Sequence, residues 1–339
     1  MADDSDEPMD PAMDEEEDEE DIADLEEVKI ALKPRCNVLA SVKEFRTNKK
    51  IGSVELDIYK NWLKDADDEH VFALFDSLGQ SKSVRSLTVM SKGSATQSLP
   101  VAYLSHCLNE ATGLREFKSV HVKWKGDKDD FAMLADTLLD HPSLRVWQLH
   151  VESMDPYERA IAAAGQIPTL REMEIQTTEP ANDKAGLTNA LKSLCTSKSL
   201  QKLRLIHVTV KFEILSNVAR LLCSNSTLQE LFIQGTELDI NGGMAMAQML
   251  TANHGLHKFV LQLDKMTSGQ KLGEAFIHAL DTNTCLEYFQ IILDGRMSDM
   301  KVVRDMQLMF RDSLRHKYKV SSQVGLSMGV ICQRKDEES

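Results

Sequence analysis

Side chains that could bind a metal or perform catalysis are few and poorly spaced in this 339-residue chain. His254 and His257 resemble half of a metal site, but the pattern places one at the end of a helix and the other at the start of a strand. No Glu or Cys stands in fixed register to complete the site. Cys195 and Cys223 occupy equivalent places on neighbouring predicted helices, whose 8–10 Å spacing is too wide for a disulfide. The sequence therefore predicts no catalytic residue, metal, cofactor or small-molecule substrate.

A second set of side chains has the types that bind proteins. These residues recur at matching places in successive segments: Glu174, Lys202, Arg204, Glu230, Phe232, Lys258, Val260 and Tyr288. Because arginine and aromatic residues dominate binding hot spots, we expect Arg204, Phe232, Val260 and Tyr288 to anchor a partner. The alternation of Glu and Lys is equally typical of a ladder of surface ion pairs, each worth at most about 1 kcal/mol.

Whether these side chains meet depends on a repeated apolar pattern. The pattern apolar-x-x-apolar-x-apolar recurs nine times at intervals of 26 to 33 residues. Its copies begin at Ile51, Val84, Leu114, Leu144, Leu170, Leu200, Leu228, Leu256 and Leu286. Only the third copy departs from the pattern, with Ser119 in the last apolar position. Recurrence at such a period is typical of a stacked repeat protein.

Each copy predicts a strand followed by a helix. The alternating end of the motif is typical of a half-buried strand. Residues six and ten positions before the next copy, such as Leu78 and Leu74, are apolar and lie on one face of a predicted helix. Strands pack about 4.8 Å apart and helices 8–10 Å apart, so stacked units must curve with the sheet inside. The predicted fold is therefore an α/β solenoid, a horseshoe with a concave parallel sheet and convex helices.

The segment from Leu228 to Gly255, LQELFIQGTELDINGGMAMAQMLTANHG, matches nine of the ten positions of a known pattern. Its matching residues are Leu228, Leu231, Ile233, Leu238, Gly242, Met246, Ala247, Leu250 and Asn253. The segment resembles the ribonuclease-inhibitor-like leucine-rich repeat, which implies about nine such repeats and a role in protein recognition. The asparagine that the family places after the strand is Thr236 here and Val208 in another copy. The asparagine ladder is therefore irregular, and we expect somewhat looser strand-to-helix turns.

Charge and composition divide the chain into regions. Residues 1–27 hold 16 of the 53 acidic residues and no Lys or Arg, which predicts a disordered acidic tail. Residues 28–50 are assigned to an N-terminal cap, 51–297 to the repeats, 298–332 to a C-terminal helix and cap, and 333–339 to a polar tail. The cap is expected to include a long helix and one final strand.

The composition also restricts the partner. Outside the tail, 39 basic residues face 37 acidic ones, so the body lacks the broad positive field that nucleic-acid binding uses. Trp124 and Tyr318 lie in basic stretches and have rings that could stack on bases. No membrane span or secretory signal is recognisable, and scattered cysteines fit a reducing compartment. We expect a cytoplasmic or nuclear monomer that binds neither nucleic acid nor membrane.

The leading hypothesis is a non-enzymatic scaffold that binds one unidentified protein on the concave sheet. Two alternatives remain. One is a regulator of a small GTPase similar to the Ran GTPase-activating protein, although that family has its acidic segment after the repeats. The other is a chaperone that binds basic proteins through residues 1–27.

Overall fold

A computed structural model describes residues 25–33, 38–60, 62, 68–93, 97–179, 184–208, 212–266, 269–293, 300–323 and 328–335. Its strands are β1 (Glu26–Leu32), β2 (Ile51–Tyr59), β3 (Ser86–Lys92), β4 (Gln97–Pro100), β5 (Glu116–Val120), β6 (Val122–Lys125), β7 (Val146–Val151), β8 (Glu172–Thr177), β9 (Lys202–Ile206), β10 (Glu230–Leu238), β11 (Lys258–Met266), β12 (Tyr288–Leu293), β13 (Tyr318–Gln323) and β14 (Met328–Arg334). Its helices are α1 (Val38–Thr47), α3 (Asp68–Gln80), α4 (Val101–Glu110), α5 (Lys128–Leu139), η1 (Asp155–Tyr157), α6 (Glu158–Ala164), α7 (Lys184–Thr196), α8 (Phe212–Leu222), α9 (Ile240–Ala252), α10 (Gly269–Thr282) and α11 (Met300–Leu314).

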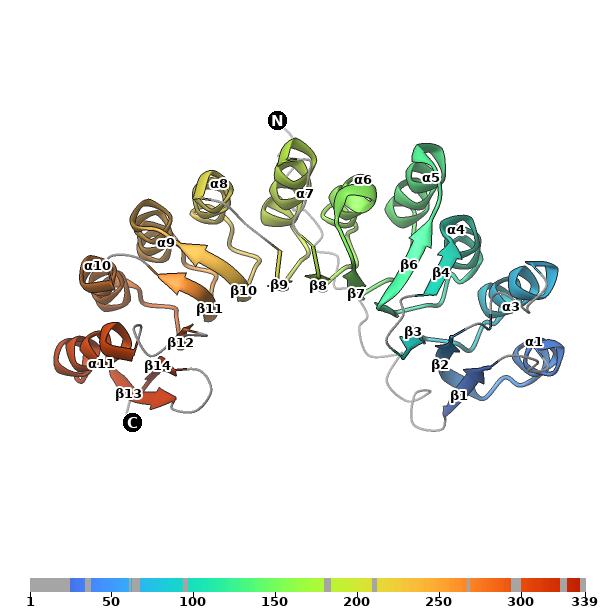
Figure 1. The fold of residues 1–339 in the computed structure, drawn as a ribbon, viewed down its shortest axis with the longest axis horizontal. Helices are drawn as coiled ribbons and strands as arrows, with labels where there is room; N and C mark the ends of the chain where they lie inside the picture. Colours follow the sequence, from blue (N-terminus) through green and yellow to red (C-terminus); the bar gives the residue numbers. More distant parts are fainter. Residues whose placement is uncertain are drawn as a thin grey trace, which may run out of the picture.

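One sheet runs through the molecule, and the predicted α/β architecture with a mostly parallel sheet is confirmed. Its strand order is β1-β2-β3-β5-β7-β8-β9-β10-β11-β12-β14-β13, parallel from β1 to β12 and antiparallel at β14 and β13. A short second sheet pairs β4 with β6. Figure 1 shows the strands lining the inside of an arc and the helices lying outside them. Neighbouring strands of the parallel part therefore follow one another along the chain, interrupted only by β4 and β6 of the second sheet.

Burial of the helices follows the predicted spacing. The two apolar columns on the helices are at most 2% exposed. They comprise Leu74, Leu78, Leu104, Leu108, Leu134, Leu138, Ala160, Ala164, Ala190, Leu194, Val218, Leu222, Met246, Leu250, Phe276 and Leu280. These side chains form the core together with the inward apolar residues of the strands. The spacing of four residues places both columns of a helix on the face toward the sheet.

Buried asparagines connect the helix-to-strand turns in the C-terminal half. Asn225, Asn253 and Asn283 occupy equivalent places and are 8%, 2% and 1% exposed. The Nδ2 of Asn253 donates to the carbonyls of Leu222 and Asn225 at 2.6 and 2.7 Å. Its Oδ1 accepts two backbone N–H groups of its own turn, at 3.0 and 2.7 Å. Since Asn225 and Asn283 repeat this arrangement, each turn is tied to the preceding one.

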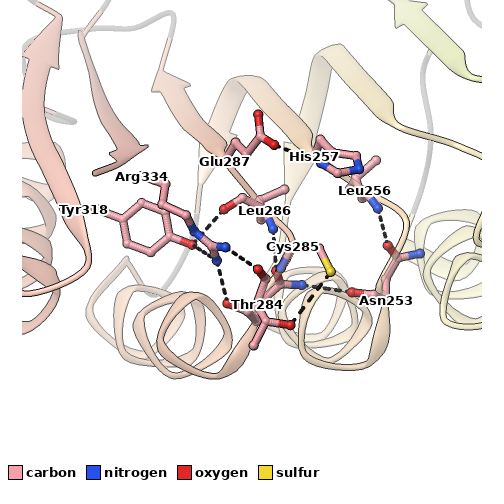
Figure 2. Close-up of polar contacts among 10 residues, drawn as sticks. Asn253, Leu256, His257, Thr284, Cys285, Leu286, Glu287, Tyr318 and Arg334 are labelled. Carbon is pink, nitrogen blue, oxygen red and sulfur yellow. Dashed lines mark hydrogen bonds and ion pairs between the residues drawn. The ribbon is translucent and has the colours of Figure 1, made fainter. Parts of the chain in front are cut away.

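The last turn of this series is covered by side chains from the C-terminal strands. Lys317 Nζ and Arg334 Nη2 donate to the Asn283 carbonyl at 2.6 and 3.0 Å. The Tyr318 hydroxyl donates to the Leu286 carbonyl at 3.0 Å, and Figure 2 shows the Tyr318 and Arg334 side chains meeting the turn. No further repeat turn follows this one, so these backbone carbonyls accept their hydrogen bonds from the three side chains instead.

Both ends of the sheet differ in detail from the predicted caps. Strand β1 begins at Glu26, inside the range assigned to the tail, because the backbone there pairs with β2. The C-terminal region has α11, as expected, but two strands rather than one. Antiparallel β14 covers the edge of β12, and β13 covers β14. Residues 1–24 and 336–339 lie outside the described residues, so the tail prediction remains a prediction there.

The backbone is irregular near the carboxyl ends of β9 and β10. His207 and Gly235 have φ of +54° and +74°, and a Cβ on Gly235 would collide with His207. The register between β10 and β11 shifts next to Gly235, between Gln234 and Thr236. These features lie at the same edge of two neighbouring strands.

The irregular third repeat copy has a compensating partner. Ser119 is 0% exposed, and its Oγ accepts a 2.8 Å hydrogen bond from Trp124 Nε1. Trp124 is 2% exposed and packs near Phe75 and Phe117. The indole therefore supplies both the apolar volume and the donor that the buried serine requires.

Candidate functional site

The sheet register places the predicted partner-binding residues in two neighbouring rows. In the central row, Glu174 pairs with Arg204, Arg204 with Phe232, and Phe232 with Val260. The flanking row runs through Glu172, Lys202, Glu230, Lys258 and Tyr288 in the same manner. Because the strands are parallel and unshifted here, equivalent side chains of successive strands point to the same face. The site thus lies on the concave face of β8 to β12.

Glu174 is held by two basic side chains. Its Oε1 lies 2.6 Å from His150 Nε2, and its Oε2 lies 3.0 Å from Arg204 Nε. The hydrogen bond from His150 lowers the pKa of Glu174, and the positive charge of Arg204 adds to this, while partial burial opposes both. The carboxylate is therefore ionised at neutral pH and fully engaged within the chain.

Arg204 also covers an aromatic ring. Its guanidinium carbon lies 4.8 Å from the centroid of Phe232, a cation–π contact. The Arg204 side chain is nevertheless 52% exposed, and only its Nε is used in the ion pair to Glu174. A depression of about 220 Å³ surrounds the pair and reaches Val146 on one side and Lys258 on the other. Arg204 is thus oriented before any partner arrives.

The lysines of the flanking row are paired with glutamates on adjacent strands. Lys202 Nζ lies 2.7 Å from Glu172, and Lys258 Nζ lies 3.6 Å from Glu230. Lys258 Nζ is also 5.6 Å from the centroid of the Tyr288 ring. All four charged side chains are 40–49% exposed, so each ion pair contributes little stability in water. The predicted ladder of surface ion pairs is therefore present beside the Arg204–Phe232 pair.

Two residues of the predicted site are largely covered within the chain. Val260 is only 4% exposed, because it lies between the longer side chains of Phe232 and Gln290 in the register. Glu174 is 13% exposed and holds Arg204 in place instead of presenting a free carboxylate. Val260 thus belongs to the packed sheet, Glu174 positions its neighbour, and their contact with a partner stays a prediction.

His150 is a member of this cluster that the sequence reasoning missed. It lies on β7 two residues after Gln148, so the alternation of strand side chains places both on the concave face. It also occupies the register row that follows the one through Glu174. A further row, taken two residues later along each strand, would have included His150.

The other chemical candidates lie apart from this face. His257 Nδ1 is 3.2 Å from Glu287, and His254 joins no group of metal ligands among the described residues. The five cysteines that the structure describes are free thiols. Burial raises the pKa of Cys195 to about 12, so this thiol stays protonated at neutral pH. Within the described ranges, no helix is long and apolar enough to cross a bilayer.

The two aromatic residues considered for base stacking belong to the core. Trp124 and Tyr318 are 2% and 1% exposed. Their polar atoms are used within the protein, in the bonds to Ser119 and to the backbone of Leu286. Neither ring presents a face on which a base could stack.

Comparison with known proteins identifies no family for this chain. No family model and no curated protein sequence matches the chain significantly. Among solved structures, a protein from Bacteroides fragilis matches with 11% identity over 76% of this chain and 72% of that chain, at a TM-score of 0.49. The Rad7 and Elc1 complex in yeast matches with 12% identity over 84% of this chain and 74% of that chain, at a TM-score of 0.45. An internalin from Listeria monocytogenes matches with 12% identity over 78% of this chain and 87% of that chain, at a TM-score of 0.29.

These similarities are too distant to transfer a function. The strands of the parallel sheet, each followed along the chain by a helix on its outer side, give this protein the general fold of a leucine-rich-repeat protein (Figure 1). What the protein does must therefore be argued from its own surface.

Proposed function

We propose that the chain is a ribonuclease-inhibitor-like leucine-rich-repeat solenoid of about nine repeats that binds a partner protein on its concave face. The observation that carries this proposal is the Arg204–Phe232 pair, which is stacked, partly exposed and fixed by Glu174. Binding hot spots favour arginine and aromatic side chains whose conformations are set before association. A partner gains contact area there with little loss of side-chain conformational entropy, because the arginine is already held in place.

The surroundings suit a mixed polar and apolar protein surface. Described contacts of the guanidinium use only Nε, so its two Nη groups can meet a carboxylate of the partner. The ring of Phe232 and that of Tyr288 offer apolar area in the same two rows. Lys202 and Lys258 are already neutralised and form a polar rim. The fixed Arg204–Phe232 pair and its polar rim support recognition of a protein rather than chemistry on a small substrate.

Quantitative affinity capture tests this proposal. The intact chain, the variant Arg204→Ala with Phe232→Ala, and a control variant Phe72→Ala with Arg159→Ala are compared. The control removes an exposed phenylalanine and an exposed arginine from the outer helices, where they are 40% and 64% exposed. Proteins lost with the concave variant but kept by the control are candidate partners.

A purified candidate then gives the decisive measurement. We expect the concave double variant to weaken its binding at least about 30-fold, the effect of losing a hot spot of roughly 2 kcal/mol. The control variant should bind within about twofold of the intact chain. If every captured protein binds the concave variant as tightly as the intact chain, the concave face is not the binding surface.

A further inference from the structure

Four arginines form a second ordered row at the amino ends of the strands. Arg85, Arg115, Arg145 and Arg171 each follow the first apolar residue of their repeat copy and precede β3, β5, β7 and β8. Their backbones are joined in register: the N–H of Arg115 donates to the Arg85 carbonyl at 2.7 Å, that of Arg145 to Arg115 at 2.7 Å, and that of Arg171 to Arg145 at 2.8 Å. The four residues are therefore spaced like neighbouring strands, about 4.8 Å apart.

Three arginines of this row line two depressions, one of which is also lined by other cations. The larger, about 610 Å³, is bordered by Arg46, Lys49, Lys82, Arg85 and Arg115, and none of the described residues that line it is a carboxylate. The smaller, about 420 Å³, continues past Arg85, Arg115 and Arg145 and includes Glu27 and Glu116. Because Arg85 and Arg115 line both, the two depressions form one continuous surface, here called the arginine groove.

Two arginines of the arginine groove, Arg85 and Arg145, keep a positive charge that no described carboxylate neutralises, whereas Arg46 is paired with Asp76 at 3.1 Å. Arg85 Nη1 donates to the Lys82 carbonyl at 2.6 Å, a bond that orients the guanidinium without cancelling its charge. Neither Arg85 nor Arg145 forms an ion pair with a carboxylate in the described ranges, in contrast to Lys202 and Lys258 on the concave face. Like charges held a few ångströms apart repel one another, so the arginine groove favours a polyanionic occupant.

A polyanionic segment of the chain itself directly precedes a residue that lines the arginine groove. Leu25 lines both depressions, and β1 begins at the next residue. The 24 residues before Leu25 contain 14 carboxylates and no Lys or Arg, with an unbroken acidic run from Asp14 to Asp21. An extended chain covers about 3.3 Å per residue, so roughly five residues span the row from Arg85 to Arg171. Three residues separate Asp21 from Leu25, a tether that gives the acidic run a high effective concentration at the groove.

We propose that the acidic segment 1–24 docks in cis on the arginine groove. Its carboxylates pair with Arg85, Arg115, Arg145 and the neighbouring lysines, and the segment thereby occupies the amino edge of the sheet. A free acidic protein or a nucleic acid would meet the same cations, but it must displace a tethered competitor. The surface is distinct from the concave Arg204–Phe232 pair, so the proposal stands independently of the partner proposed there.

Carbodiimide cross-linking of the full chain tests the docking directly, because it joins carboxylates to lysines in contact. In dilute protein at low salt, we expect tail carboxylates to couple to Lys49 and Lys82 at least about tenfold more than to Lys271, an exposed lysine on α10. The variant Arg85→Glu with Arg145→Glu should lose this preference. The matched variant Arg220→Glu with Arg311→Glu makes the same charge change on the outer helices α8 and α11 and should retain it. Even coupling to all three lysines, or a preference unaffected by Arg85→Glu and Arg145→Glu, would refute the proposal.

A competition experiment on the full chain separates cis docking from a merely basic surface. The probe is a labelled peptide with the sequence of residues 1–24. We expect it to bind at least about tenfold more tightly when the eight acids from Asp14 to Asp21 are changed to their amides, because the groove is then vacant. Raising the salt concentration from 50 to 300 mM should abolish that binding. Equal peptide affinity of the intact and amide chains would show that the acidic segment does not occupy the groove. Circular dichroism melting curves confirm that each variant is folded.

Discussion

His141 should make the stability of this protein depend on pH. It occupies the turn position that Asn225, Asn253 and Asn283 fill in later repeats, and it is 3% exposed. Its Nδ1 accepts backbone N–H groups of Ser143 and Leu144 at 3.4 and 3.2 Å. The Nε2 atom has no hydrogen-bond partner in the described structure. We therefore expect the imidazole to remain neutral in the folded protein.

Protonating His141 is costly for two reasons. Burial disfavours the charged ring and lowers its pKa to about 4, an effect that the nearby backbone of Ala111 only partly offsets. In addition, a proton on Nδ1 would point at the two N–H groups that this nitrogen now accepts. The unfolded chain, with a pKa near 6.5, binds the proton more readily than the folded chain between pH 6.5 and 4. Stability from the neutral ring is therefore present above about pH 6.5 and is lost as the pH falls toward 4.

The expected size of the effect follows from these two pKa values. Linkage gives a destabilisation of roughly 0.2 kcal/mol at pH 7 and about 2 kcal/mol at pH 5. Replacing His141 with Asn removes the titrating group. It also supplies an amide oxygen for the same two backbone donors and an amide N–H for the carbonyl of the preceding turn. The variant should therefore gain close to 2 kcal/mol over the wild type between pH 7 and pH 5.

Urea unfolding at pH 7, 6 and 5, followed by tryptophan fluorescence and circular dichroism, measures this difference. Other groups titrate in both proteins and cancel in the comparison. The reciprocal variant Asn225→His serves as a control and should acquire the pH dependence that His141→Asn loses. If the difference in free energy of unfolding between His141→Asn and wild type is the same at pH 7 and pH 5, the reasoning is refuted.

Three other predictions concern single contacts. Asn253→Ala should destabilise the protein by about 3 kcal/mol or more, because buried backbone groups of two turns lose their partner, and urea unfolding measures it. Trp124→Phe should cost about 2 kcal/mol by leaving the Ser119 hydroxyl unpaired; adding Ser119→Ala should recover part of this loss, and a double-mutant cycle that shows no coupling would contradict it. Glu174→Gln should release Arg204 and weaken partner binding with little effect on folding, because the concave pair is part-exposed; unchanged affinity in calorimetry would argue against the positioning role of Glu174.

Most of the fold prediction depended on the periodic spacing of apolar side chains. The spacing of Leu74 and Leu78, repeated in each later helix, places both columns against the sheet with almost no exposure. Such positions are predictable because burial depends on a residue's place in a regular repeat. Ser119 was visible only as an exception, since its partner Trp124 comes from a short extra strand, β6, that the repeat pattern does not contain.

The candidate site was less predictable than the fold because register does not determine accessibility. The row through Arg204 and Phe232 follows the strand register. Val260 was nevertheless assigned as an anchor, although the longer neighbours on β10 and β12 shield it. His150 was missed because a single strand pattern does not reveal which acid across the sheet a histidine will meet. Both outcomes depend on side-chain length across strands, which a one-dimensional pattern does not encode.

In stacked repeats, residues at equivalent positions of successive strands form a row of side chains. The signs of the charges in such a row determine which groups the row can bind. On the concave face, Glu and Lys alternate across strands, so the row neutralises itself and leaves Arg204 and Phe232 as its distinctive feature. At the amino edge, one sign is repeated from Arg85 to Arg171, and no alternation is available to cancel it. Carboxylates must then come from outside the row. We propose that the acidic segment that precedes Leu25 supplies them.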